Sequence, residues 1–274
     1  MQETWSEEKT SIQKNVHINF IRTQSNDRPT IILAHGITDM GLCWQPFAAD
    51  LEADYDIIMY DAYGHGRSSR IDPDSRFDLA ADLHDLINTL KLEKPGIIGH
   101  SMGAATAAEF AARYPDMLSA LILEDPPWSD EKNKPEQIEA TRQTWKQRIE
   151  DEKEKTVKEL VKLKKKEAPN WDERILETWA QAKHAFDPAF LDHYSFKPID
   201  WRAQVKNITA PTLLVTGDTE HGALVDLKTG VEAVKLLDKG EFGHISNAGH
   251  CVRYEQYAPY LAMVKLFLKR NMPV

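Results

Sequence analysis

The stretch Gly96-Ile97-Ile98-Gly99-His100-Ser101-Met102-Gly103 decides the fold of this chain. It joins a short apolar run to the small-residue pattern of residues 104–108, which is typical of a helix. Glycines two positions before and two positions after Ser101 permit a sharp strand-to-helix turn, because neither carries a side chain that would clash there. Such a turn presents the Ser101 hydroxyl at a helix N-terminus, where free N–H groups favour a developing negative charge. The pattern therefore predicts a nucleophilic serine.

Short apolar runs recur along the chain and alternate with helical patterns. They occupy residues 30–34, 56–60, 96–99, 120–123 and 212–216. Runs of this kind are typical of strands buried on both faces, whereas residues 16–22 alternate as an antiparallel strand would. The order predicts an α/β fold, with a mainly parallel sheet and helices on both faces. We expect the chemistry at the carboxyl ends of the strands, where such sheets bind their ligands.

Length and composition exclude several classes of protein. The chain has 274 residues, 42% of them hydrophobic, which is enough for one large core with an insertion. No apolar stretch approaches the roughly 18 residues of a membrane span, and the polar start of the sequence lacks the apolar core of a signal peptide. A net charge of −9 argues against nucleic acid as a partner. We expect a cytoplasmic protein that acts on a small molecule, without a membrane or nucleic acid partner.

Three further motifs complete a set with the turn at Ser101. His35-Gly36-Ile37-Thr38 and Asp61-Ala62-Tyr63-Gly64-His65-Gly66-Arg67-Ser68 each follow an apolar run, and Ala248-Gly249-His250 lies near the C-terminus. In this order the four motifs resemble those of the α/β-hydrolase superfamily of esterases, lactonases and dehalogenases, over about residues 30–269. The resemblance implies an α/β-hydrolase fold, with a mostly parallel, eight-stranded sheet flanked by helices.

The resemblance also implies an inserted helical cap over the active site. Residues 128–201 would form this cap, and residues 1–127 and 202–274 would form the core. The segment interrupts the alternation of strands and helices and is rich in Lys and Glu, and its lysine run 162–166 reads as a solvated helix face.

Five of the seven tryptophans lie in this segment. They are Trp128, Trp145, Trp171, Trp179 and Trp201. We expect one or two of them to line an apolar pocket and the others to pack helix against core. Trp128 is the favoured substrate contact, together with Gly36 on the opposite loop.

A serine hydroxyl needs an adjacent base, and His250 is the best candidate because it lies on a turn just before the last helical pattern. The carboxylate that orients this histidine has two candidates. Asp125 ends the apolar run that neighbours the serine strand, and Pro126 follows it, which cannot continue a central strand. Glu220 follows the next run. The resemblance leaves both open, since the superfamily uses both positions. We favour Asp125, with Glu220 as the alternative and Asp218 behind it.

The backbone N–H groups of Ile37 and Met102 are the expected oxyanion hole, because they lie in the His-Gly loop and at the helix start. His35 and His65 are expected to hold loop backbone rather than take part in chemistry. Neither these nor the other histidines show metal-ligand spacing, so we expect no metal and no organic cofactor.

These residues together predict a serine hydrolase that cleaves a carboxylic ester or lactone through an acyl-enzyme. The serine itself argues against dehalogenase or epoxide hydrolase chemistry, which in this superfamily uses an aspartate nucleophile. A C–C bond hydrolase or thioesterase could use the same three residues. A third alternative is a ligand receptor that signals through the cap and keeps only vestigial hydrolysis. Cys43 and Cys251 form no disulfide framework and are expected to be small packing residues.

Overall fold

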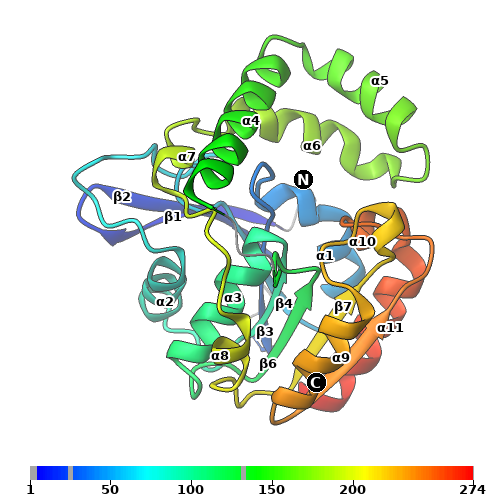
Figure 1. The fold of residues 1–274 in the computed structure, drawn as a ribbon. Helices are drawn as coiled ribbons and strands as arrows, with labels where there is room; N and C mark the ends of the chain where they lie inside the picture. Colours follow the sequence, from blue (N-terminus) through cyan, green and yellow to red (C-terminus); the bar gives the residue numbers. More distant parts are fainter. Residues whose placement is uncertain (1–4, 24–26, 131–133, 274) are drawn as a thin grey trace.

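The computed structural model describes residues 5–23, 27–130 and 134–273. A single sheet runs through the molecule in the strand order β1-β2-β4-β3-β5-β6-β7-β8 (Figure 1). Its strands are β1 (Ser6–Gln13), β2 (Val16–Arg22), β3 (Thr30–Ala34), β4 (Asp56–Tyr60), β5 (Gly96–His100), β6 (Ala120–Glu124), β7 (Thr212–Thr216) and β8 (Gly240–His244). Strand β2 pairs antiparallel with both of its neighbours, and the other pairs are parallel. The predicted mostly parallel, eight-stranded sheet is confirmed.

Helices cover both faces of this sheet. The helices of the described residues are α1 (Gln45–Leu51), α2 (Leu79–Thr89), α3 (Met102–Arg113), α4 (Pro135–Lys153), α5 (Val157–Glu167), α6 (Glu173–Ala185), α7 (Phe190–His193), α8 (Trp201–Val205), α9 (Leu227–Leu236), α10 (Val252–Glu255) and α11 (Tyr257–Asn271), with 3-10 helices η1 (Gly41–Trp44) and η2 (Thr219–His221). Alternate strand residues face opposite sides. Ile32 and Ile97 pack with α2, α3, α8 and α9, whereas Ile31 and Ile98 pack with α1 and α11. Burial on both faces explains the continuous apolar runs.

Helices α4, α5 and α6 form a layer of their own above the carboxyl ends of the strands (Figure 1). Apolar side chains of α5 and α6 pack on one another, as Leu160, Ile175 and Trp179 do, and Tyr254 of α10 completes the cluster. At the base of this layer, Trp128 and Trp201 stack with their rings 5.7 Å apart, and both are buried. Trp128 and Trp201 are the first and last residues of the predicted cap, so the stack brings its two ends together. The division into cap and core stays a prediction.

The turn after β5 has the strained backbone that the sequence predicts. Ser101 has φ 54° and ψ −115°, which is rare for a residue with a side chain. A Cβ atom at Gly99 would lie 2.4 Å from the carbonyl oxygen of Gly103, and one at Gly103 would lie 2.2 Å from that of Ala34. Helix α3 therefore sits so close to the sheet that only glycine fits at both positions.

Replacement of Gly103 by alanine tests this close approach. We expect Gly103→Ala to lower the free energy of unfolding by about 3 kcal/mol or more, because backbone atoms of β3 would have to move. Gly222 is the matched control, since it has φ 97° but open space around it, and Gly222→Ala should cost only about 1 kcal/mol of backbone strain. Urea unfolding followed by circular dichroism measures both, and equal losses would contradict the account.

Candidate active site

The ends of β5 and β6 and the loop after β8 carry three polar side chains to one point. Ser101 follows β5 directly and Asp125 follows β6 directly, and the last residues of these two strands pair side by side. Asp125 has φ 42°, and its N–H donates to Val215 of the next strand. His250 lies in the loop between β8 and α10. The carboxyl edge of the sheet is thus where these groups meet, as expected for a parallel sheet.

These three residues form one chain of hydrogen bonds. Ser101 Oγ lies 2.9 Å from His250 Nε2 and donates to it. On the other side of the ring, His250 Nδ1 donates to Asp125 Oδ2 over 2.6 Å. The carboxylate is fully buried, whereas 30% of the His250 side chain is exposed. The arrangement can remove a proton from Ser101 and hold the resulting imidazolium beside a carboxylate.

The Asp125 carboxylate is also held by backbone donors. The N–H groups of Leu224 and Val225 donate to its two oxygens over 2.8 and 3.0 Å. They come from the segment before α9, more than 90 residues away in the sequence, so no local pattern shows them. Together with His250 they fix the position of a charge that burial alone would disfavour.

The alternative carboxylates lie elsewhere. Glu220 is exposed on η2, and among the described residues it makes no hydrogen bond to His250. Asp218 accepts from His244 Nε2 over 2.8 Å and from the Asn247 N–H over 2.6 Å. Asp218 therefore supports the loop that carries His250, and of the three candidates Asp125 is the one in contact with the histidine.

The two residues whose N–H groups are the expected oxyanion hole lie near Ser101, since Met102 follows it in the chain and Ile37 lines the same cavity. Met102 is the first residue of α3, Ile37 lies in the loop after β3, and neither N–H donates to another group in the described part of the chain. His35 Nδ1 donates to the Gly36 carbonyl, and His65 Nε2 contacts the Ile37 carbonyl over 2.7 Å. Burial lowers the pKa of His35 to about 4 and that of His65 to about 3. Both rings are neutral at pH 7 and hold the loop.

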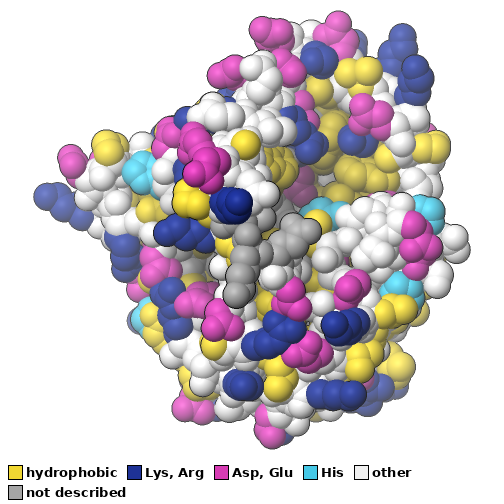
Figure 2. Space-filling view, in the orientation of Figure 1, with side chains coloured by type: hydrophobic (Ala, Val, Ile, Leu, Met, Phe, Trp, Pro, Cys, Tyr) yellow, Lys and Arg dark blue, Asp and Glu magenta, His cyan; other side chains and the backbone are white. Residues whose placement is uncertain are grey.

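A cavity of about 220 Å³ opens beside Ser101 and His250. One wall is the loop of Gly36 and Ile37, and the other is made by side chains of α4, α5 and α6. The space-filling view shows this face hollowed beneath the three helices, with hydrophobic and basic side chains in the hollow (Figure 2). The lining tryptophans are Trp145, Trp171 and Trp179.

The expectation for Trp128 differs from what the structure shows. Trp128 is 1% exposed, stacks on Trp201 and is absent from the described residues that line this cavity. Pro126 and Pro127 turn the chain after β6, and the indole packs into the core beneath the cap. Gly36, the other expected contact, does line the cavity.

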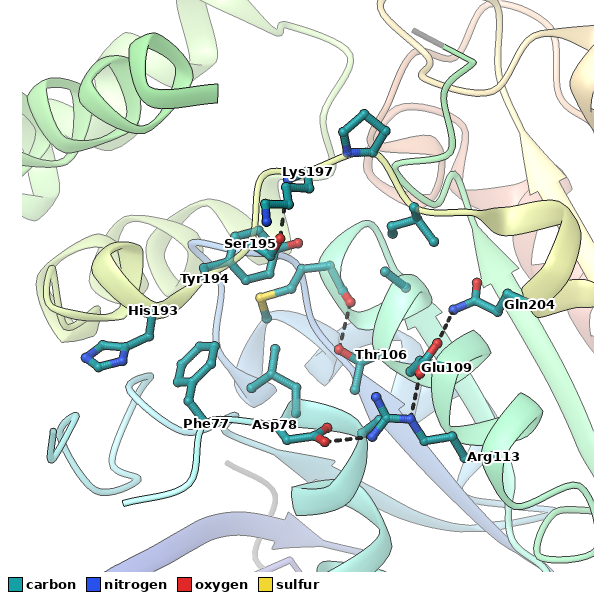
Figure 3. Close-up of a pocket in the computed structure, with 16 residues that line it drawn as sticks. Phe77, Asp78, Thr106, Glu109, Arg113, His193, Tyr194, Ser195, Lys197 and Gln204 are labelled. Carbon is teal, nitrogen blue, oxygen red and sulfur yellow. Dashed lines mark hydrogen bonds and ion pairs between the residues drawn. The ribbon is translucent and has the colours of Figure 1, made fainter. Parts of the chain in front are cut away.

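A second cavity of about 430 Å³ lies between α2, α3 and the segment 193–199 (Figure 3). The Met102 side chain lines it, but Ser101 and His250 do not. Three of its charged residues are paired with one another, since Arg113 bonds both Asp78 and Glu109. The catalytic chemistry therefore belongs to the smaller cavity.

The family model for the alpha/beta hydrolase fold matches residues 29–257. The chain is an α/β-hydrolase. A curated relative, epoxide hydrolase 1 of Caenorhabditis elegans, is 24% identical over 94% of this chain and 69% of its own length. Other curated relatives are 31–36% identical, over 35–36% of this chain and only 28–38% of their own length.

Solved structures of other α/β-hydrolases superpose on nearly the whole chain. An N-formylmaleamic acid deformylase from Pseudomonas putida has a TM-score of 0.77 at 21% identity, covering 94% of this chain and 100% of its own. A thermophilic esterase from Thermogutta terrifontis has a TM-score of 0.75 at 21% identity, covering 97% and 99%. At these identities the likeness establishes the fold.

Across residues 5–23, 27–130 and 134–273, no group of three or more His, Cys, Asp or Glu side chains could hold a metal ion. Within the same residues, each helix is too short or too polar to cross a bilayer. Burial raises the pKa of both thiols, Cys43 and Cys251, so the thiolate form is disfavoured at each.

A buried ion pair ties helix α6 of this α/β-hydrolase to the loop after β3. Lys183 of α6 donates to the carbonyl and hydroxyl oxygens of Thr38 over 2.9 and 2.7 Å and lies 3.3 Å from Asp39. Lys183 and Asp39 are both buried. Burial alone would raise the pKa of Asp39, but Lys183 and Arg253 lower it to about 2. Asp39 is therefore charged at pH 7.

Removal of the Lys183 charge should destabilise the protein in a pH-dependent way. We expect Lys183→Met to cost about 3–5 kcal/mol at pH 7, because the buried Asp39 carboxylate loses its partner. Since the folded pKa of Asp39 lies below its ordinary value of 3.8, the stabilisation is complete above that value and is lost as the pH falls toward about 2. The difference between variant and wild type should therefore shrink from pH 5 to pH 3.

Urea unfolding at several pH values measures this difference. The control is Lys166→Met, because Lys166 is exposed on the neighbouring helix α5 and its removal should cost less than about 0.5 kcal/mol. If Lys183→Met loses the same free energy of unfolding at pH 5 and at pH 3, Asp39 is not the charge that Lys183 compensates.

Proposed function

We propose that this α/β-hydrolase cleaves a small carboxylic ester or lactone, with Ser101 as nucleophile, His250 as general base and Asp125 as the carboxylate that orients it. The observation that carries the proposal is the unbroken chain of hydrogen bonds from Asp125 through His250 to Ser101, at 2.6 and 2.9 Å. Both distances lie within the reach that proton transfer requires.

In the first half-reaction, Ser101 Oγ attacks the acyl carbon while His250 Nε2 takes the serine proton. The carbonyl oxygen becomes negative and is stabilised by the N–H groups of Ile37 and Met102. Asp125 holds the proton on His250 Nδ1 and stabilises the imidazolium. The bond to the alcohol oxygen then breaks, and that oxygen receives the proton from His250 Nε2. The products are the acyl-enzyme and an alcohol, which for a lactone stays part of the acyl group.

In the second half-reaction, water takes the place of the alcohol. His250 Nε2 removes a proton from the water as it attacks the acyl carbon, and the same two N–H groups stabilise the second oxyanion. Collapse of this intermediate breaks the bond to Ser101 Oγ, which regains its proton from His250. The carboxylic acid leaves and the enzyme is restored.

A serine nucleophile favours ester hydrolysis over epoxide opening, the reaction that the name of the epoxide hydrolase relative indicates. A serine ester is hydrolysed by water attack at the acyl carbon, whereas epoxide opening in this superfamily uses an aspartate, and residue 101 is serine. The esterase among the structural neighbours agrees with the proposal, and the deformylase shows that amide substrates suit the same fold. The cytoplasmic location expected from the sequence stays a prediction.

Three variants test the assignment of roles. We expect Ser101→Ala to abolish turnover, and Asp125→Asn to lower kcat by about 10⁴-fold, because the orienting carboxylate is lost. Glu220→Gln should stay within about twofold of wild type, because Glu220 does not contact His250. Steady-state hydrolysis of p-nitrophenyl acetate and butyrate and of a small lactone panel measures all three.

Two outcomes would overturn the proposal. A large loss in Glu220→Gln together with a small loss in Asp125→Asn would reverse the roles of the two carboxylates. Wild-type protein that performs only one turnover per molecule would favour the cap-gated receptor. Thermal unfolding of each variant separates a catalytic loss from a folding defect.

A further inference from the structure

The cavity beside Ser101 carries an excess of positive charge, although the chain as a whole has a net charge of −9. The charged side chains among its described lining residues are Arg148, Lys164, Lys183 and Asp39. Lys183 and Asp39 neutralise each other, and the three bonds of Lys183 leave its ammonium without a free donor. Arg148 and Lys164 each form an ion pair with a glutamate outside the described lining, Glu152 and Glu167 respectively, and each keeps further donors for a ligand in the cavity.

Lys164 is held against the aromatic wall. Its Nζ lies 5.0 Å from the ring centre of Trp171 and 4.8 Å from that of Trp179, and 14% of its side chain is exposed. It also pairs with Glu167 over 3.0 Å, which uses one of its three donors. Glu167 is 63% exposed and lines an adjacent depression rather than the cavity. The lysine-rich run 162–166 predicts a solvated helix face, and Lys164 departs from that expectation.

Arg148 presents an open guanidinium edge. Its Nε donates to Glu152 over 2.9 Å, and its guanidinium carbon lies 5.2 Å from the ring centre of Trp145. Its two terminal nitrogens make no hydrogen bond within the described residues. Such a planar pair of donors fits a carboxylate in the bidentate manner, which a single ammonium cannot do.

The lining of the cavity includes a buried histidine, His100, with one ring nitrogen that is unpartnered among the described residues. His100 lines it and is 3% exposed, its Nε2 donates to the His250 carbonyl over 3.0 Å, and its Nδ1 has no partner in the described part of the chain. Burial and the Arg253 charge lower the pKa of His100 well below 6.5, so the ring is neutral and Nδ1 is a bare acceptor.

We propose that Arg148 and Lys164 form an anion subsite on the cap, and that the substrate of this hydrolase carries a carboxylate. The proposal rests on the proposed function and names its substrate class. The carboxylate lies against the cap wall, across the cavity from Ser101, and the tryptophans cover the carbon chain between them. A volume of about 220 Å³ holds about seven waters at ~30 Å³ each, so the substrate is a small molecule.

Two pairs of esters that differ only in charge test this subsite. They are 4-acetoxybenzoate against 4-acetoxybenzamide, and monomethyl adipate against methyl adipamate. One pair carries the charge on the alcohol side of the scissile bond and the other on the acyl side. We expect the kcat/KM of the wild type to be at least tenfold higher for the carboxylate than for the amide in one pair or both. One charge-assisted hydrogen bond is strong enough to produce a difference of this size.

The preference should depend on the two cap cations. Lys164→Gln and Arg148→Gln should each lower kcat/KM for the carboxylate about tenfold and leave the amide within about twofold. Lys164→Arg should keep the preference, because the charge remains. Lys166→Gln is the matched control on the same helix and should behave as wild type. Added salt should reduce the preference in wild type, since part of the subsite is exposed.

The result that overturns the subsite is equal kcat/KM for carboxylate and amide in both pairs, or a preference unchanged in both Gln variants. If wild type hydrolyses none of the four esters, the proposed function fails, and binding then tests the subsite separately. Tryptophan fluorescence of Ser101→Ala should report tighter binding of 4-acetoxybenzoate than of 4-acetoxybenzamide, and addition of Lys164→Gln should remove the difference. Equal binding of both compounds would also overturn it.

Discussion

The close approach of helix α3 to the sheet is the constraint on which the active site depends. Gly99 and Gly103 let the helix backbone lie against the backbone of β3, and the chain can then turn only through the strained conformation of Ser101. The same turn places the Met102 N–H at the helix start, beside the hydroxyl. The proposed nucleophile and one proposed oxyanion donor thus come from one feature of the backbone, and the neighbouring strand β6 carries Asp125 to the same edge of the sheet.

A buried polar network joins this edge of the sheet to the cap. Arg253 donates to both oxygens of Glu124, once through its backbone N–H and once through its guanidinium, and also to the Tyr254 hydroxyl. Tyr254 donates to Asp39, which Lys183 of the cap contacts in turn. One network therefore links the residue before Asp125, helix α10 after His250 and the loop after β3. Because its charges are buried, each depends on the others.

Much of this arrangement could be predicted from the sequence, because short-range patterns encode it. The buried strands, the glycines around Ser101 and the late His250 turn each depend on neighbouring residues. The choice between Asp125 and Glu220 could be favoured but not decided, since both follow core strands and only a distance in three dimensions separates them. Trp128 was misjudged as a substrate contact and Lys164 as a solvated residue for a related reason. Which side chains of an inserted helix face a cavity depends on how the helices pack. The sequence pattern of the helix is the same whether a given side chain faces the cavity, the core or solvent.

The central claim is that Asp125 and His250 make Ser101 a nucleophile. The most direct measurement is the rate at which a fluorophosphonate modifies the protein, with the modified residue located by peptide mass spectrometry. The account predicts one adduct per chain at Ser101, formed much more slowly in Asp125→Asn and at an unchanged rate in Glu220→Gln. A stable adduct at another residue, or labelling of Ser101 at the same rate in Asp125→Asn, would contradict it.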